Sequence, residues 1–188
     1  MMTVAEALEI SRVGTILPDL AELEFAAAVE GEHSMRRLVA EWQSGALRFD
    51  SPGEELLVAR LYGRTIAVGG VTSEPSGDEA FRLRRFYVLP ARRNRGIGRA
   101  LATRLIEAPE RSRLVLTVHA GNPQASRFWE RLGFVPVDGL PYSHRRSPPP
   151  PPSRGSMRHR LAQIHHPHGE PVEPWAAGTK PRGSTGSP

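Results

Sequence analysis

The sequence contains no cysteine. This absence excludes disulfide bonds, thiolate metal sites and cysteine nucleophiles, and it agrees with a reducing compartment. Apolar residues make up 39% of the chain, a little below the usual share in globular domains, so we expect part of the chain to lie outside the packed core. A length of 188 residues suits one domain of ordinary size with an additional segment.

Long apolar runs are also missing. No stretch approaches the ~18 consecutive apolar residues that a membrane-spanning helix needs. The first residues, MMTVAEALEI, lack the basic start and the apolar core of a secretory signal peptide. We therefore expect a soluble, cytoplasmic protein without a membrane partner.

Net charge is absent from most of the chain. Residues 1–142 contain eighteen Lys plus Arg and eighteen Asp plus Glu, whereas residues 143–188 contain seven and two, which accounts for the net charge of +5. The basic character belongs to the end of the chain and is weak evidence for a nucleic-acid partner of the folded part. A nucleic-acid-associated protein that uses this basic end is kept as an alternative interpretation.

The segment from Ser147 to Pro188 is predicted to be a disordered tail. Five consecutive prolines begin it, and these cannot join a helix or a sheet ladder. The remainder is rich in Gly, Pro, Ser and Thr and offers few large apolar side chains for a core. The proline run fits a passive spacer better than a ligand for an SH3-like domain. No metal site is expected on the tail histidines, because no regular scaffold fixes them: His159, His165, His166 and His168.

Residues 1–146 are predicted to form one mixed α/β domain. A first helix is expected over residues 16–30, with Pro18 near its first turn. A second is expected from Ser34, as N-cap, to Gly45, which ends it. Two strands, residues 55–62 and 65–72, flank Gly63-Arg64, and a glycine first in a two-residue loop suits a type II′ hairpin.

The second half of this domain alternates strands and helices. Strands are expected at residues 81–90 and 114–120, with a helix beginning at Ile97 between them. Strands that flank a helix in this way are expected to be parallel. A final short pair of strands is expected at residues 134–138 and 140–144.

The stretch RRNRGIGRAL, residues 92–101, lies between a predicted strand and a predicted helix. The first N–H groups of a helix lack partners inside the helix and favour an anion, and the helix dipole adds to this preference. Gly96 and Gly98 allow a phosphate to approach the backbone. The stretch fits neither G-x-G-x-x-G, because Leu101 stands at the third glycine position, nor the G-K-[ST] pattern of a P-loop. A solvated basic turn is the plain alternative.

The pattern that fits is R-x-x-G-x-G, from Arg93 to Gly98, directly after a strand that ends in Tyr-Val-Leu-Pro. Here the chain resembles the GNAT superfamily of N-acetyltransferases, whose pyrophosphate-binding motif is [QR]-x-x-G-x-[GA]. A second block, GNPQASRFWERLGF at residues 121–134, resembles a later motif of the same family. Asn122 suits an N-cap, Pro123 the first helical position and Gly133 the position after the helix.

The resemblance implies a GNAT-like fold with two splayed parallel strands and direct transfer of an acetyl group from acetyl-CoA to an amine. It implies that the backbone of Phe86 and Val88 holds the acetyl carbonyl and the pantetheine arm, and that Asn122 lies near this arm. Donors aimed at an oxygen that gains charge assist such a reaction. The implied pyrophosphate site consists of Arg93, Asn94, Arg95, Gly96, Ile97, Gly98 and Arg99.

Two positions depart from the family pattern. Many members carry a glutamate base where this chain has Arg82, which cannot act as a base at neutral pH. Many also carry a tyrosine, as proton donor to the thiolate, where this chain has Trp129. An acyl-CoA-binding or regulatory module without catalysis is therefore a second alternative.

Candidates for acid–base chemistry are His119, as a base or proton relay, and Tyr87, which either lines the site or packs in the core. Asp78 and Glu79 fit a solvated turn better than a base acting through water. Arg82 and Arg84 should share one face of their strand. If that face lines the acceptor site, the acceptor amine should carry a carboxylate. A homodimer is a possible assembly, and no metal is expected.

Overall fold

Among residues 8–76, 79–111 and 114–148, which the computed structural model describes, seven strands form one sheet in the order β1-β2-β3-β4-β5-β7-β6. Neighbouring strands are antiparallel except for β4 and β5, which are parallel. This confirms the predicted mixed α/β class and the parallel unit around the basic stretch. The strands are β1 Leu8–Arg12, β2 Glu55–Leu61, β3 Arg64–Ser73, β4 Ala80–Val88, β5 Val115–Val118, β6 Val135–Pro136 and β7 His144–Arg146.

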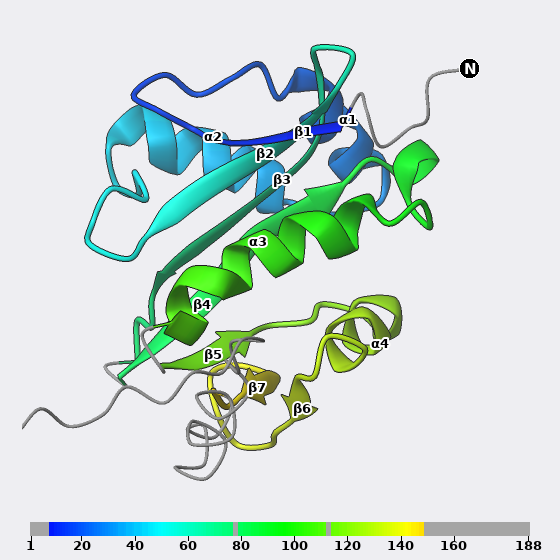
Figure 1. Ribbon diagram of the computed structural model, residues 1–188. Coiled ribbons are helices and arrows are strands. Elements are labelled where there is room, and N and C mark those ends of the chain that lie inside the picture. Colours follow the sequence, from blue (N-terminus) through cyan, green and yellow to red (C-terminus); the bar gives the residue numbers. More distant parts are fainter. Residues whose placement is uncertain (1–7, 77–78, 112–113, 149–188) are drawn as a thin grey trace, which may run out of the picture. The chain divides into compact units, whose positions relative to one another are not determined.

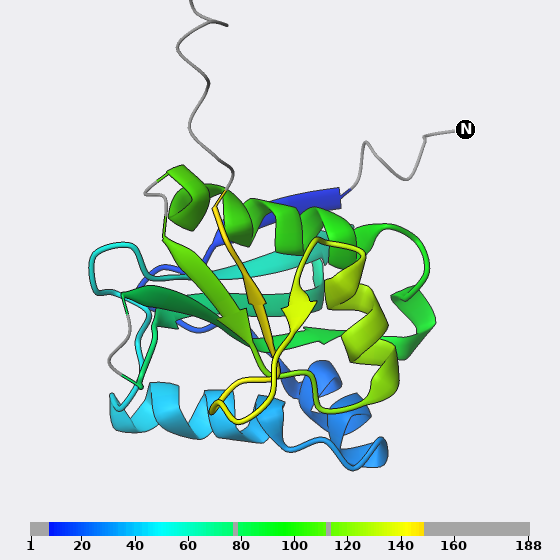
Figure 2. The same cartoon turned by 90° about the horizontal axis from the view of Figure 1, so that it is seen from below.

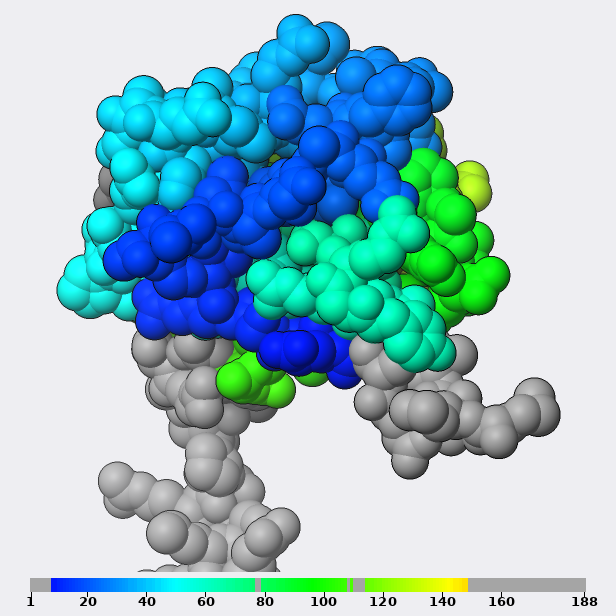
Figure 3. Space-filling view, turned by 90° about the horizontal axis from the view of Figure 1, so that it is seen from above, coloured from blue at the N-terminus to red at the C-terminus, as the bar shows by residue number. Residues whose placement is uncertain are grey.

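Helices cover both faces of the sheet. α1 (Ala21–Val29) and α2 (Ser34–Ser44) lie on one face, and α3 (Ile97–Arg111) lies on the other with α4 (Pro123–Glu130) beside it (Figure 1, Figure 2). The segment that joins β1 to α1 runs over the surface beside α2 (Figure 3). A short 3-10 turn, η2 (Pro90–Arg92), joins β4 to the start of α3. None of the described helices combines the length and the apolar character that a bilayer crossing requires.

The helix boundaries differ modestly from the predicted ones. α1 begins at Ala21 instead of Ile16, and the Asp19 carboxylate accepts a hydrogen bond from the Ala21 N–H at 2.9 Å. His33, and not Ser34, is the residue that precedes α2. Gly45 ends α2 in the left-handed conformation with φ 76°, as predicted.

The hairpin between β2 and β3 turns one residue earlier than predicted. Leu61 pairs with Arg64, so Tyr62 and Gly63 form the two-residue loop. Both have positive φ, 51° and 77°, which is the pattern of a type I′ turn and not of type II′. Glycine thus occupies the second loop position, and Arg64 already belongs to the strand.

Two strands, β1 at one edge of the sheet and β7 next to the other edge, were not placed correctly from the sequence. β1 was not predicted, and its ladder with β2 from Leu8–Leu61 to Arg12–Leu57 comes from chain segments about fifty residues apart. The last strand, β7, begins at His144, where the predicted strand ends, and it pairs with both β5 and β6. Pairing across the sheet, rather than local pattern, fixes both.

A glycine pair in β3 lets aromatic rings approach both faces of the sheet. A Cβ on Gly69 would lie 2.6 Å from the Phe86 ring, on the face that α3 covers. A Cβ on Gly70 would collide with the ring of Phe49, on the opposite face. The register between β3 and β4 shifts at this point, and Arg85 of β4 has φ 55°, a conformation that is strained for a residue other than glycine. β4 therefore contains a bulge beside Gly69.

Candidate active site

The parallel strands β4 and β5 are paired only over the first part of β4, before the bulge. Their ladder runs from Ala80–Val115 to Leu83–Val118 and then stops, although β4 continues to Val88 (Figure 1). The edge of β4 from Arg84 to Val88 therefore has no strand beside it on the β5 side, within the described chain. We call this edge the fork, and it agrees with the splayed strands that the family resemblance implies.

Val88 directs its carbonyl into the fork. The N–H of Leu89 donates to the carbonyl of Ile66 in β3 at 3.0 Å. The carbonyl of Val88 belongs to the same planar trans peptide unit and points the opposite way, toward the β5 side. Phe86 contributes the backbone two residues earlier on the same edge, while its ring packs toward α3. Both residues predicted to hold the pantetheine arm thus lie on an open strand edge.

We call the turn before α3 the cradle, because the sequence predicts that it binds an anion. Asn94 and Gly96 both have positive φ, 59° and 80°, and α3 begins at Ile97. The first bond within the helix is from the Ala100 N–H to the Gly96 carbonyl at 2.9 Å. The N–H groups of residues 97–99 therefore have no partner in the helix. A Cβ built on Gly96 meets nothing within 4 Å, so the space over this turn is open.

The arginines of this turn have different environments. Arg95 and Arg99 are exposed, with no ion pair to another described residue, so they are available to an anion. Arg93 is engaged: its guanidinium donates to both carboxylate oxygens of Glu30 at 2.7 and 2.6 Å, and its Nε donates to the Val88 carbonyl at 3.0 Å. The side chain of Arg93 thus connects the end of α1 to the fork.

Tyr87 completes this cluster from the α1 face of β4. Its hydroxyl donates to Glu30 at 2.7 Å, and the Arg93 guanidinium lies 5.3 Å from its ring centroid. The hydrogen bonds from Arg93 and Tyr87 outweigh desolvation and lower the pKa of Glu30. Burial, together with the hydrogen bond to Glu30, raises the pKa of Tyr87. At neutral pH Glu30 is therefore an anion and Tyr87 a neutral hydrogen-bond donor.

A second cluster forms around Arg82, where the family usually places a glutamate. The Arg82 guanidinium donates to Glu74 at 3.0 Å and pairs with it at 2.7 Å, and it reaches the Pro141 carbonyl at 3.2 Å. The Glu74 side chain has no exposed surface and also accepts a hydrogen bond from Thr117 of β5. Burial would raise the pKa of Glu74, but the bonds from Thr117, the Ser76 N–H and Arg82 outweigh it and lower that pKa. Arg82 thus holds together the paired part of β4 and β5.

The remaining predicted residues lie around the end of β5. The side chain of Asn122 accepts a hydrogen bond from the Ala125 N–H at 2.8 Å and so caps α4, as predicted. His119 is exposed at the end of β5. Trp129 is 3% exposed and packs against the rings of Phe86, Phe128 and Phe134. The indole is therefore part of the core rather than of a solvent-accessible site.

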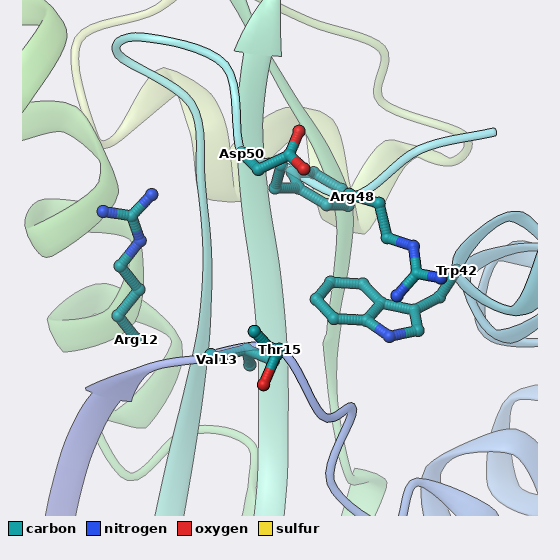
Figure 4. A pocket seen from close by; sticks show the side chains of 8 residues that line it. Arg12, Val13, Thr15, Trp42, Arg48 and Asp50 are labelled. Carbon is teal, nitrogen blue, oxygen red and sulfur yellow. The ribbon is translucent and has the colours of Figure 1, made fainter. Parts of the chain in front are cut away.

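One opening in the described part of the chain adjoins this region, and another lies away from it. One, of about 490 Å³, lies beside α4 and includes Asn122, and its wall carries a hydrogen-bonded chain of Ser143, His144 and Ser126 at 2.8 and 2.9 Å. The other, of about 420 Å³, lies at the end of β1, and Arg48 stacks there over Trp42 beside Asp50 (Figure 4). None of the residues predicted for the site lines the second opening.

The sequence did not reveal the carboxylates of this site. Glu30, Glu41 and Glu74 pair with arginines that are 63, 44 and 8 positions away in the chain. Two of these separations are far beyond any local pattern, and glutamates are common on exposed helix faces. Glu74 and Arg82 are only eight positions apart in the chain, so this was the one of the three ion pairs that the sequence could have suggested. The tail histidines and Asp78 lie outside the described residues.

Comparisons with known proteins agree with this geometry. The profile described as Acetyltransferase (GNAT) family matches residues 17–134. No curated protein matches the chain. Similar solved structures include a protein from Exiguobacterium sp. 255-15 assigned as an acetyltransferase, with TM-score 0.68, 23% identity, and coverage of 83% of this chain and 98% of that one.

Two further similar structures contain the cofactor. YncA from Salmonella typhimurium, with acetyl-CoA, has TM-score 0.54 and 20% identity, with 75% of this chain and 94% of that one covered. The PaiA N-acetyltransferase from Thermoplasma acidophilum, with coenzyme A, has TM-score 0.52 and 17% identity, with 74% and 98% covered. At these identities the likeness concerns the fold.

Proposed function

This chain belongs to the acetyltransferase (GNAT) family, and we propose that it transfers an acetyl group from acetyl-CoA to a primary amine of a small molecule or a peptide. Membership makes it an acyl-CoA-dependent N-acetyltransferase with acetyl-CoA as cosubstrate. We propose further that both substrates are bound together and that the amine attacks directly. The observation that carries the proposal is the open β4 edge that leads directly into the anion cradle before α3.

The residues present fit the cofactor. The free N–H groups of residues 97–99 and the open space over Gly96 suit a pyrophosphate, and the exposed Arg95 and Arg99 supply positive charge beside it. The edge from Arg84 to Val88 offers backbone groups to an extended chain in the way that a strand would. When bound, acetyl-CoA supplies a thioester carbonyl carbon, which exchanges its bond to sulfur for a bond to nitrogen, so that CoA thiol is released and the amine loses one proton.

The groups that handle this proton come from the α1 face of β4 and from the end of β5. Arg82 is not a base, and Trp129 is buried, so neither family position serves here. We assign proton transfer to His119, which is exposed and has no described partner. Tyr87, the second candidate, is buried and its hydroxyl donates to Glu30, so we propose it only as a relay through that hydrogen bond. The departures at Arg82 and Trp129 also favour the second candidate function, an acyl-CoA-binding module with weak catalysis.

One pair of measurements separates these functions. We expect acetyl-CoA to raise the melting temperature of the full chain and to release CoA thiol when an amine acceptor is present. A shift in melting temperature without thiol release across a broad panel of amines would favour the binding module. No shift at millimolar acetyl-CoA would refute both functions. His119→Asn and Tyr87→Phe should lower kcat without abolishing the acetyl-CoA shift.

A further inference from the structure

The bulge in β4 places three arginines on the face covered by α1 and α2. Arg82 and Arg84 pair in register with Thr72 and Gly70 of β3, and the bulge follows them. Arg85 has a positive φ, and its guanidinium reaches Glu41 of α2. Without the bulge, Arg84 and Arg85 would point to opposite faces, because side chains of neighbouring strand residues alternate.

Two of these arginines are neutralised by carboxylates. Arg82 pairs with Glu74 at 2.7 Å, and Arg85 binds both oxygens of Glu41 at 3.0 and 2.5 Å. The cluster therefore contains three cations and two anions, and it carries one excess positive charge at neutral pH. That charge lies on the face of β4 that also contains Tyr87, the hydrogen-bond partner of Glu30.

Arg84 carries the excess charge. Its Nε is buried and has no hydrogen-bond partner among the described residues. The two terminal nitrogens have no described partner either, and they are not among the buried atoms, so they are accessible to solvent. Burial and then the neighbouring Arg85 lower the pKa of Arg84, in agreement with a cation that lacks a counterion. A guanidinium in this setting favours a ligand that supplies one.

Arg84 is also close to the fork. It begins the unpaired edge and precedes Phe86 by two residues, with the bulge residue Arg85 between them. The Arg side chain is long enough to reach a group on the acceptor while the amine of the same molecule lies at the fork. A single negative charge balances the cluster, whereas a dianion would also meet repulsion from Glu41 and Glu74.

We propose that the acceptor is an amine that carries a carboxylate, and that the terminal nitrogens of Arg84 bind this carboxylate. The inference rests on the proposed transfer of acetyl groups to amines and names the class of amine. It narrows the prediction made from the sequence, in which Arg82 and Arg84 shared the role. Arg82 is paired with the fully buried Glu74, and this ion pair stabilises the paired part of β4 and β5 instead.

Acceptors that carry either a carboxylate or its uncharged amide test this proposal. Glycine, β-alanine and γ-aminobutyrate, each compared with its amide, vary the distance between amine and carboxylate while keeping a primary amine. Because the amide lowers the pKa of the ammonium group, kcat/KM is expressed per free-base amine. For the best chain length we expect kcat/KM for the acid to exceed that for the amide by about tenfold or more, since a charge-assisted pair of hydrogen bonds is lost in the amide. Arg84→Gln should reduce this ratio to near one. Arg36→Gln, an exposed α2 arginine without a described partner, should leave the ratio unchanged.

A binding measurement makes the test independent of turnover. In the presence of CoA, the best acid should raise the melting temperature of the wild-type chain and of Arg36→Gln but not that of Arg84→Gln. An unchanged acid-to-amide ratio in Arg84→Gln, or an equal shift in melting temperature, would overturn the proposal. Preference for amides at every length, or no shift with any acid, would overturn it as well. The acetyl-CoA shift and turnover of neutral amines would in those cases still support acetyl transfer.

Discussion

The two sides of the fork are built in different ways. The side proposed to bind acetyl-CoA, called the cofactor side, consists of backbone groups from one continuous segment, the end of β4, the turn at Asn94 and Gly96, and the start of α3. The side proposed to bind the amine, called the acceptor side, consists of side chains from α2, β4 and β5 and from the residues that follow α1 and β3, which meet in ion pairs such as Glu74–Arg82 and Glu41–Arg85. A site made of backbone depends on local conformation, whereas a site made of charged side chains depends on which element lies opposite.

This difference has a consequence for charge. The cofactor side has exposed, unpaired arginines that can bind a highly charged ligand in water. On the acceptor side, Arg82 and Arg85 of β4 are each paired with a carboxylate, because partly buried charges are costly when unpaired. Arg84 is the exception. Specificity for the acceptor should therefore depend on few groups, and affinity for the cofactor on many.

The largest expected effect is on the stability of the acceptor side. Arg82→Gln leaves the fully buried Glu74 without its cation, so we expect the free energy of unfolding to fall by about 3 kcal/mol. Arg84→Gln removes a cation that has no described partner and should leave the free energy unchanged or slightly raised. Urea denaturation of both variants measures the contrast. Equal losses of stability would mean that Arg84, like Arg82, is held by a carboxylate of the folded protein.

The next effect concerns the backbone of the cofactor side. Gly96→Ala places a Cβ in the open space of the cradle and strains a residue with φ 80°, so we expect the Kd for acetyl-CoA to rise by about tenfold. Gly63→Ala is a matched control, because Gly63 has φ 77° and equally open surroundings but lies in the β2–β3 turn. Both should lose roughly 1 kcal/mol of stability. Calorimetric titration that finds the same Kd for both variants would argue against the cradle.

The link between the two sides is Glu30, and its effect should depend on pH. The folded-state pKa of Glu30 is lowered, so its ionised form contributes stability at neutral pH that is lost as pH falls below the usual glutamate range. We expect Glu30→Gln to be less stable than wild type by about 1 kcal/mol at pH 7, since the pair is partly exposed, and the difference to shrink toward pH 3. Thermal unfolding across this range measures it. A difference that grows as pH falls would contradict the assigned pairing.

The smallest expected effect is on the exposed charges of the cradle. Arg99→Gln removes one unpaired cation near the start of α3, so the Kd for acetyl-CoA should rise about threefold at low salt and less at high salt. Arg131→Gln, an exposed arginine at the end of α4, is the control and should not change Kd. A salt-independent Kd in the wild-type chain would show that the arginines of this turn do not contribute.

The cofactor side could be predicted because its signals are local. Gly96 lies in the turn before α3, Asn122 caps α4, and α3 begins at Ile97. The parallel arrangement of β4 and β5 followed from the helix between them. Where local signals were weaker the prediction shifted by a residue, as at Tyr62-Gly63, or was absent, as for β1.

The sequence by itself determined the fold class, the family and the strand–turn–helix unit in which we place the cradle, because turn residues, capping residues and apolar periodicity act over short distances along the chain. Only the tertiary structure decided which charges are neutralised. The bulge at Arg85 brought Arg85 to the same face as Arg82 and Arg84. Helix packing then placed Glu41 beside Arg85 and Glu30 beside Arg93, just after the end of β4. Ion pairing depends on distances between elements, which the order of residues does not specify, and that is why Arg84 could be separated from Arg82 only in the folded protein.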